Sequence, residues 1–113
     1  MIIKQLDKKH LKIGNNDVIF DYSISKYLIH KNFVIILLDY GENLVRWGQF
    51  PNLFCANEEK GIIWKAELPT SETGDSYFDI KIKNNDLHAY SVCSYDCIMD
   101  IETGKIISSE FTK

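Results

Sequence analysis

A short unit that reads as strand, turn, strand occurs twice in this chain. The first turn is residues 57–61 (Asn-Glu-Glu-Lys-Gly) and the second is residues 100–104 (Asp-Ile-Glu-Thr-Gly), an offset of 43 residues. Asn and Asp open tight turns because their side chains bond the backbone two residues on, and Gly closes them because it accepts a positive φ. A repeat of about this period is typical of stacked or radial β architectures. The unit therefore predicts a β-meander.

Hairpin signals continue along the rest of the chain. Turn-forming residues separate apolar stretches at residues 14–17, 84–86 and 94–96. Residues 39–47 resemble a third, weaker copy of the repeated unit. Residues 33–38 (Phe-Val-Ile-Ile-Leu-Leu) are apolar without alternation, which is typical of a strand buried on both faces. This stretch is therefore predicted to be a central strand.

The spacing of apolar residues characterises two further stretches. Residues 77–83 alternate, which turns Phe78, Ile80 and Ile82 toward a core. Residues 23–31 place apolar side chains at helical spacing, but the same stretch fits a strand leading into the apolar segment that follows it. A strand is the alternative that we favour there.

Together these signals predict an all-β fold. We expect a single domain over residues 1–113, an antiparallel meander of about 8–11 short strands with at most one short helix. The meander would form a twisted sheet, a sandwich or a half-open barrel. The final strand, residues 105–111, carries the Lys and Glu that suit an exposed edge. Trp47 and Trp64 each end an apolar strand, where Trp usually fills the core. If either were exposed, it would instead be a candidate interface anchor.

The composition disfavours several functional classes. The net charge is −3, Arg46 is the only arginine, and no basic cluster is longer than two lysines, so nucleic-acid binding is not expected. The longest apolar run is too short to cross a membrane as a helix. Three cysteines and an N-terminus without signal-peptide features predict a cytoplasmic protein. The excess of Lys over Arg, with many Ile and Asn, is typical of a low-GC bacterial genome.

No catalytic constellation stands out. The histidines, His10, His30 and His88, are scattered, although His88 lies two residues from Tyr90 and would share its sheet face. Cys93 and Cys97 flank a three-residue turn and could meet as a disulfide or as half of a metal site, but a zinc site needs four ligands. We therefore predict no catalytic residue, no metal and no cofactor, with the cysteines packing as small apolar residues.

The second turn resembles a known repeat. Residues 100–105 (Asp-Ile-Glu-Thr-Gly-Lys) are similar to the Asp-x-x-Thr-Gly-Lys turn of quinoprotein-type β-propeller repeats, although Ile98 and Ser108 replace the Ala and Trp of that unit. The resemblance implies blade-like hairpins and does not imply quinone binding. A propeller needs at least about four blades, and this chain has strands for roughly two.

In size, charge and style, the chain is also similar to small acidic bacterial proteins that neutralise secreted toxins. That resemblance implies a non-enzymatic protein-binding module, an immunity protein whose partner is a basic toxin domain. The residues expected to meet the partner are Glu58 and Glu59 in the first turn, with Glu72 and Asp75 in the polar loop 69–76, if the fold brings turn and loop to one side. A homodimer through an exposed edge strand is also allowed.

A second class of function stays open. The chain would then be a small-molecule-binding domain, or an enzyme without a recognisable motif, with its site in the mouth of a barrel or in a cleft. The polar groups of that site would be Tyr77, His88, Tyr90 and Tyr95. A deep pocket with convergent polar side chains would favour this class, and a flat face with exposed aromatic residues would favour protein binding.

Overall fold

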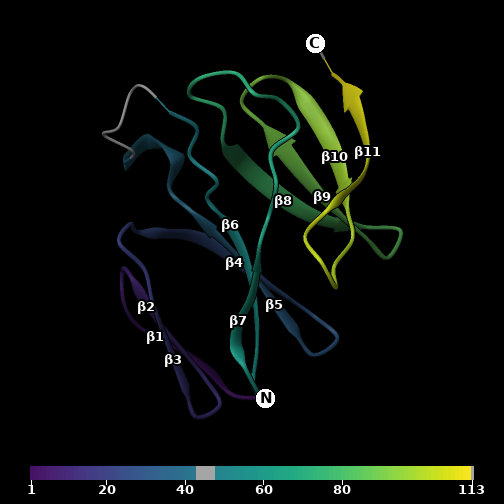
Figure 1. Ribbon diagram of the computed structural model, residues 1–113. Coiled ribbons are helices and arrows are strands. Elements are labelled where there is room, and N and C mark those ends of the chain that lie inside the picture. The colour runs from purple at the N-terminus through teal and green to yellow at the C-terminus, as the bar shows by residue number, and fades with distance from the viewer. Residues whose placement is uncertain (43–47, 113) are drawn as a thin grey trace.

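The fold is a meander of antiparallel strands. The computed structural model describes residues 1–42 and 48–112, and over these residues the chain forms eleven strands and one short 3₁₀ turn. The strands make three sheets that follow one another along the sequence, and the molecule measures 39 × 33 × 18 Å (Figure 1). The prediction of an all-β antiparallel meander is therefore confirmed, as stacked sheets.

The N-terminal sheet has three strands in sequence order. They are β1 (Ile3–Asp7), β2 (His10–Ile13) and β3 (Asn16–Ile19). Gly14 lies in the turn between β2 and β3 and has a φ of 58°, which glycine adopts without a steric penalty. The first hairpin expected from the turn residues is thus present.

The middle sheet has four strands, also in sequence order. They are β4 (Ile24–His30), β5 (Phe33–Leu38), β6 (Leu53–Asn57) and β7 (Gly61–Lys65). The 3₁₀ turn η1 (Tyr40–Glu42) follows β5. The ambiguous stretch before residue 33 is therefore a strand. The expected third copy of the repeat, residues 39–47, lies partly outside the described residues, and Trp47 lies wholly outside them.

The C-terminal sheet repeats the four-stranded meander. Its strands are β8 (Tyr77–Lys83), β9 (Asp86–Ser91), β10 (Tyr95–Met99) and β11 (Ile106–Phe111), with β8 and β11 at its two edges. The register of β8 against β9 shifts between Tyr77 and Asp79, which marks a bulge at Phe78. Because of the bulge, Tyr77 points into the core and Phe78 is 47% exposed. The expectation that Phe78 faces the core is wrong for this reason.

The middle sheet lies between the other two and separates two hydrophobic cores. Along β5, Val34 and Ile36 join the core shared with the N-terminal sheet, whereas Ile35 and Leu37 join the core shared with the C-terminal sheet. The strand is therefore buried on both faces, as its unbroken apolar run predicts. Each such side chain contributes about 1.5–3 kcal/mol of transfer free energy relative to an exposed position.

The two repeated turns share their backbone geometry. Gly61 has a φ of 74° and Gly104 a φ of 76°, as their turn positions predict. The turns also touch through one side chain, because the buried Trp64 on β7 donates its indole N–H to the carbonyl of Ile101, at 2.8 Å. The core position expected for Trp64 is confirmed, and this residue joins the middle sheet to the C-terminal sheet.

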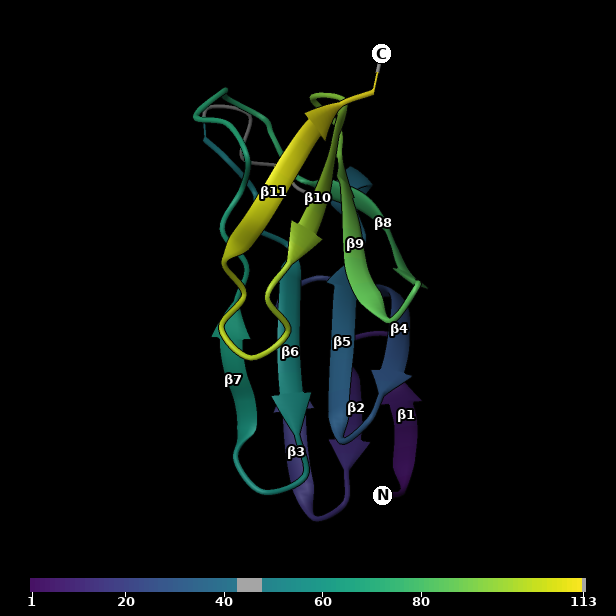
Figure 2. The same ribbon diagram turned by 90° about the vertical axis from the view of Figure 1, so that its right-hand side faces the viewer.

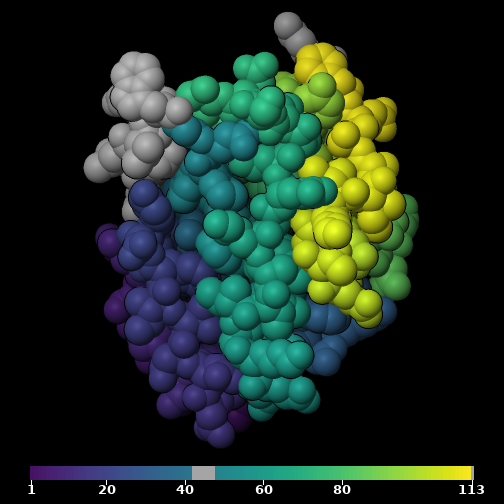
Figure 3. Space-filling model, viewed as in Figure 1, coloured from purple at the N-terminus to yellow at the C-terminus, as the bar shows by residue number. Residues whose placement is uncertain are grey.

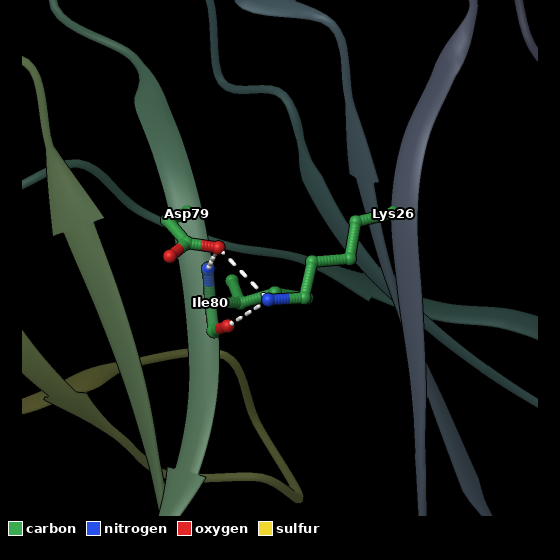
Figure 4. Close-up of polar contacts among 3 residues, drawn as sticks. All are labelled: Lys26, Asp79 and Ile80. Carbon is green, nitrogen blue, oxygen red and sulfur yellow. Dashed lines mark hydrogen bonds and ion pairs between the residues drawn. The ribbon is translucent and has the colours of Figure 1, made fainter.

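A lysine joins the facing edges of the same two sheets. Lys26 on β4 reaches β8, where its Nζ lies 2.9 Å from Oδ1 of Asp79 and 2.8 Å from the carbonyl oxygen of Ile80 (Figure 4). Oδ1 of Asp79 also accepts the backbone N–H of Ile80, at 2.9 Å. The hydrogen bond from Lys26 is the main reason that the pKa of Asp79 is lowered below its ordinary value. This contact holds the bulge of β8 against β4.

The Lys26–Asp79 pair should make stability depend on acid pH. A carboxyl group whose pKa is lowered by folding stabilises the fold above its unfolded pKa of about 4, and the contribution is lost as pH falls through the folded value. Lys26→Met should therefore cost less than about 1 kcal/mol at pH 7, since the pair is partly exposed. Denaturant titrations at several pH values should show the difference between wild type and variant shrinking below pH 4. A difference in stability that does not change with pH would show that Lys26→Met acts only through lost packing.

Candidate functional site

The exposed glutamates predicted to meet a partner lie at opposite ends of the molecule. Glu58 and Glu59 are exposed in the turn between β6 and β7, and Glu72 is exposed in the loop between β7 and β8. Figure 2 shows this turn at the lower end of the middle sheet and this loop at the upper end. In addition, Glu58 packs against Gly14, and its backbone carbonyl accepts a hydrogen bond from the side chain of Asn16. The fold does not gather these carboxylates on one side.

Asp75 is not available to a partner at all. Its side chain is fully buried and accepts hydrogen bonds from the hydroxyls of Thr70 and Ser91, both at 2.7 Å, and from the backbone N–H of Ser76, at 3.0 Å. A buried carboxylate is tolerated only when donors replace water in this way. The predicted exposure of Asp75 is therefore wrong, and its side chain anchors the loop between β7 and β8.

The four residues of the alternative site do not converge. Tyr77 is buried between sheets, where its hydroxyl donates to the carbonyl oxygen of Glu67 at 2.6 Å. Tyr95 packs against the same core, with its ring 5.5 Å from that of Phe111. His88 and Tyr90 alternate with the buried residues of β9 and lie on the outer face of the sheet. No shared cleft unites these four side chains.

Three rings form a row on that outer face. The ring centroids of Phe78 and Tyr90 are 6.4 Å apart, and those of Tyr90 and His88 are 6.3 Å apart with nearly parallel planes. Strand alternation places His88 and Tyr90 on one face of β9, as their spacing predicted, and the bulge of β8 adds Phe78. We call these three residues the aromatic row.

Polar contacts hold the aromatic row in place. Nδ1 of His88 lies 2.8 Å from Oδ1 of Asp96 on β10, which fixes the orientation of the imidazole. Partial burial, with the carboxylates of Asp96 and Asp79, raises the pKa of Tyr90. The phenol therefore stays protonated at neutral pH and presents a hydrogen-bond donor beside the apolar ring of Phe78 and the imidazole of His88. Rings held in this way lose little side-chain entropy when a partner covers them.

The cysteines do not supply a reactive thiol. All three are free. Burial raises the pKa of Cys55 to about 12 and that of Cys97 to about 11, and partial burial with the neighbouring Asp75 raises the pKa of Cys93. The thiolate is the nucleophilic form, so these side chains are poorly reactive at neutral pH. Within residues 1–42 and 48–112, no cluster of His, Cys, Asp and Glu has the arrangement of a metal site.

One open hollow of about 540 Å³ lies at the upper end of the C-terminal sheet. The loop between β7 and β8 forms one wall with Thr70 and Glu72, and Cys93, Tyr95 and Phe111 form the other. Of the four residues expected in a ligand site, only Tyr95 lines it. In the part of the chain that the structure describes, no helix is long and apolar enough to span a membrane.

The model of one protein family, described as a domain of unknown function (DUF7957), matches residues 1–111. The chain belongs to the DUF7957 family. The match covers all three sheets, so the aromatic row and the hollow both lie inside the DUF7957 domain. No curated protein and no solved structure matches the chain.

Sequence reasoning missed Phe78 as a surface residue. A regular alternation over residues 77–83 assigns Phe78 to the core, and the bulge reverses that assignment. The sequence gives little indication of the bulge, because Asp79 stabilises it partly through Lys26. That residue lies 53 residues earlier, so the contact is not visible in the local pattern. The position of His88 and Tyr90 on one face of β9 follows from strand alternation alone, so it could be predicted from the sequence.

Proposed function

We propose that this DUF7957 domain is a non-enzymatic protein-binding module and that the aromatic row is its partner surface. One exposed ring, Phe78, beside the partly buried and preorganised rings of Tyr90 and His88 carries this proposal. Phe78 is 47% exposed although it is a large apolar side chain, and Tyr90 and His88 extend the surface across β9. Aromatic side chains supply most of the affinity at protein interfaces, because each buries a large apolar area and Tyr adds a hydrogen bond.

Charge supports a basic partner. The chain carries a net charge of −3, and the carboxylates of Asp96 and Asp79 lie close enough to Tyr90 to raise its pKa. Asp96 also bonds His88 and Asp79 pairs with Lys26, so the supporting charge is chiefly that of the whole chain. Acidic groups at the rim of an interface speed the encounter with a basic protein. A bacterial cytoplasmic immunity protein that neutralises a basic toxin domain would have this combination of features, and this is the specific role that we propose.

The hollow beside Tyr95 supports a second candidate function. Its lining combines two rings, Tyr95 and Phe111, with the hydroxyl of Thr70 and the carboxylate of Glu72. A small polar ligand would find both stacking and hydrogen-bonding groups there. In this alternative the domain binds a metabolite, and the aromatic row is dispensable.

Substitution in the aromatic row should weaken partner binding and leave the fold intact. Tyr90→Ala removes the central ring, and loss of a hot-spot residue of this kind weakens binding about tenfold or more. Tyr40→Ala is the matched control, because Tyr40 is an exposed tyrosine in η1, outside the aromatic row. The partner should be captured from the native host with the wild-type domain, identified, and titrated against both variants.

The outcomes separate the two functions. Weaker binding by the Tyr90 variant alone supports the aromatic row, and if the partner is a toxin domain, only wild type and the Tyr40 variant should protect cells that express it. Equal binding by both variants would contradict this surface. A metabolite that co-purifies with wild type and is lost in a Tyr95→Ala variant would favour the hollow instead.

A further inference from the structure

Most strand edges of this fold are covered by other strands of the same chain. The three sheets have two edges each, and β3 of the N-terminal sheet lies beside β7 of the middle sheet. At the other side of the middle sheet, β4 is joined to β8 by Lys26. β1 and β11 are the two remaining edges among the described strands. The start of β11 is covered, because the N–H of Ile106 donates to Oε1 of Glu67 at 2.8 Å and the N–H of Glu67 donates to the carbonyl of Gly104 at 3.3 Å. The part of β11 that can accept another strand is therefore residues 107–111.

The two free edges differ in how well they could pair. Both edges contain a register shift, between Gln5 and Asp7 in β1 and at Ile107 in β11, which restricts regular pairing to part of each strand. β1 also carries Lys4, which discourages a further strand. β11 holds neither Lys nor Pro, and its only charge is Glu110. Figure 3 shows β11 (yellow) uncovered along one side of the molecule. The lysine expected to protect the final strand, Lys105, precedes β11 and leaves its pairing edge unprotected.

The backbone of β11 presents unused hydrogen-bonding groups outward. The N–H of Thr112 bonds the carbonyl of Ser94, on the side of β10. Backbone groups of alternate residues point to the same side of an antiparallel strand. Glu110 and Ser108 therefore face β10, whereas the N–H and C=O groups of Ser109 and Phe111 point away from the sheet. These outward groups are the template for another strand.

We propose that β11 pairs antiparallel with β11 of a second copy of this chain, with Ser109 of each copy opposite Ser109 of the other. The pairing joins two four-stranded sheets into one continuous sheet across a two-fold axis. It uses the edge of the C-terminal sheet opposite to β8, so the aromatic row stays accessible and this proposal does not depend on the proposed function.

The side chains of β11 select this register. Residues whose backbone groups point away from β10 must stand opposite one another in the two copies. A two-fold pairing can therefore be centred on Ser108, Ser109 or Glu110. A register centred on Glu110 sets two glutamates directly opposite, which destabilises a sheet. A register centred on Ser108 leaves Phe111 without an apolar partner. The register centred on Ser109 sets Ile107 opposite Phe111, which are 67% and 56% exposed in a single copy, and sets Glu110 opposite Ser108.

Two lysine substitutions at neighbouring positions test the pairing and its register. Ser109→Lys sets two lysines opposite one another, and Ser108→Lys sets each lysine opposite Glu110 of the other copy. Both serines are exposed, so both variants should fold. Sedimentation should be followed from about 1 μM to about 1 mM, where a small edge-to-edge interface dimerises. The dissociation constant of the Ser109 variant should exceed that of the Ser108 variant by about tenfold or more.

A proline provides a second test that the monomer tolerates. Ser109→Pro removes an N–H that the ladder with β10 does not use, so circular dichroism and thermal unfolding should stay native while the dimer is lost. Tyr90→Ala should dimerise like wild type. A wild-type protein that stays monomeric up to about 1 mM overturns the proposal. A Ser109→Lys variant that dimerises as well as Ser108→Lys overturns the register.

Discussion

Gly104→Ala should lower the free energy of unfolding by about 2–4 kcal/mol, whereas Gly61→Ala should lower it by about 1 kcal/mol. The two glycines occupy equivalent turns with nearly the same φ, so the backbone strain of an added side chain is the same for both. They differ in what a Cβ would meet. At Gly104 it would lie 2.5 Å from the indole of Trp64, whereas at Gly61 the nearest atom is 3.9 Å away.

The excess cost at Gly104 arises because Trp64 cannot move aside freely. Its indole N–H donates a hydrogen bond to the backbone carbonyl of Ile101, and its ring is buried in the core between the middle and C-terminal sheets. Urea denaturation of both variants, with unchanged slopes, gives the comparison directly. Equal losses would show that the ring adjusts without cost and that only backbone strain matters. A stable Gly104 variant would contradict the packing of the two turns.

Local turn chemistry and apolar patterning predicted most of the strands. The turns at residues 14–17, 57–61 and 100–104 depend on side chains and glycines within a few positions, so their hairpins are readable from the sequence. The unbroken apolar run of β5 correctly indicated burial on both faces. The stacking order of the three sheets was not predicted, because it depends on which outer faces pack together and not on any single segment.

The candidate site was predicted less well, for two physical reasons. The first is long-range contact, since the bulge that exposes Phe78 depends on Lys26, and the burial of Asp75 depends on Ser91. The second is strand direction. The turn with Glu58 and the loop with Glu72 are separated by the length of β7, about 3.3 Å for each residue, so they must lie at opposite ends of the sheet. That step was accessible from the sequence and argues against one compact cluster of these carboxylates.

Removal of the buried carboxylate should be the most damaging single change in the loop. Asp75→Ala is expected to lower the free energy of unfolding by about 3–5 kcal/mol, because the hydroxyls of Thr70 and Ser91 and the N–H of Ser76 lose their acceptor away from water. Asp75→Asn keeps the shape and should cost about 1–2 kcal/mol. Glu72→Ala is the matched control in the same loop, and its exposed side chain should matter by less than about 0.5 kcal/mol.

A double-mutant cycle shows whether the lost stability comes from the hydrogen bonds of Asp75 or from other contacts of the loop. Ser91→Ala removes one donor from β9, so its cost should fall when Asp75 is already absent, with a coupling free energy of about 1 kcal/mol or more. The same variants should leave Tyr90-dependent partner binding and β11 pairing intact wherever the protein is folded. Additive losses would mean that Asp75 and Ser91 act independently, and a stable Asp75→Ala variant would contradict the burial of this carboxylate.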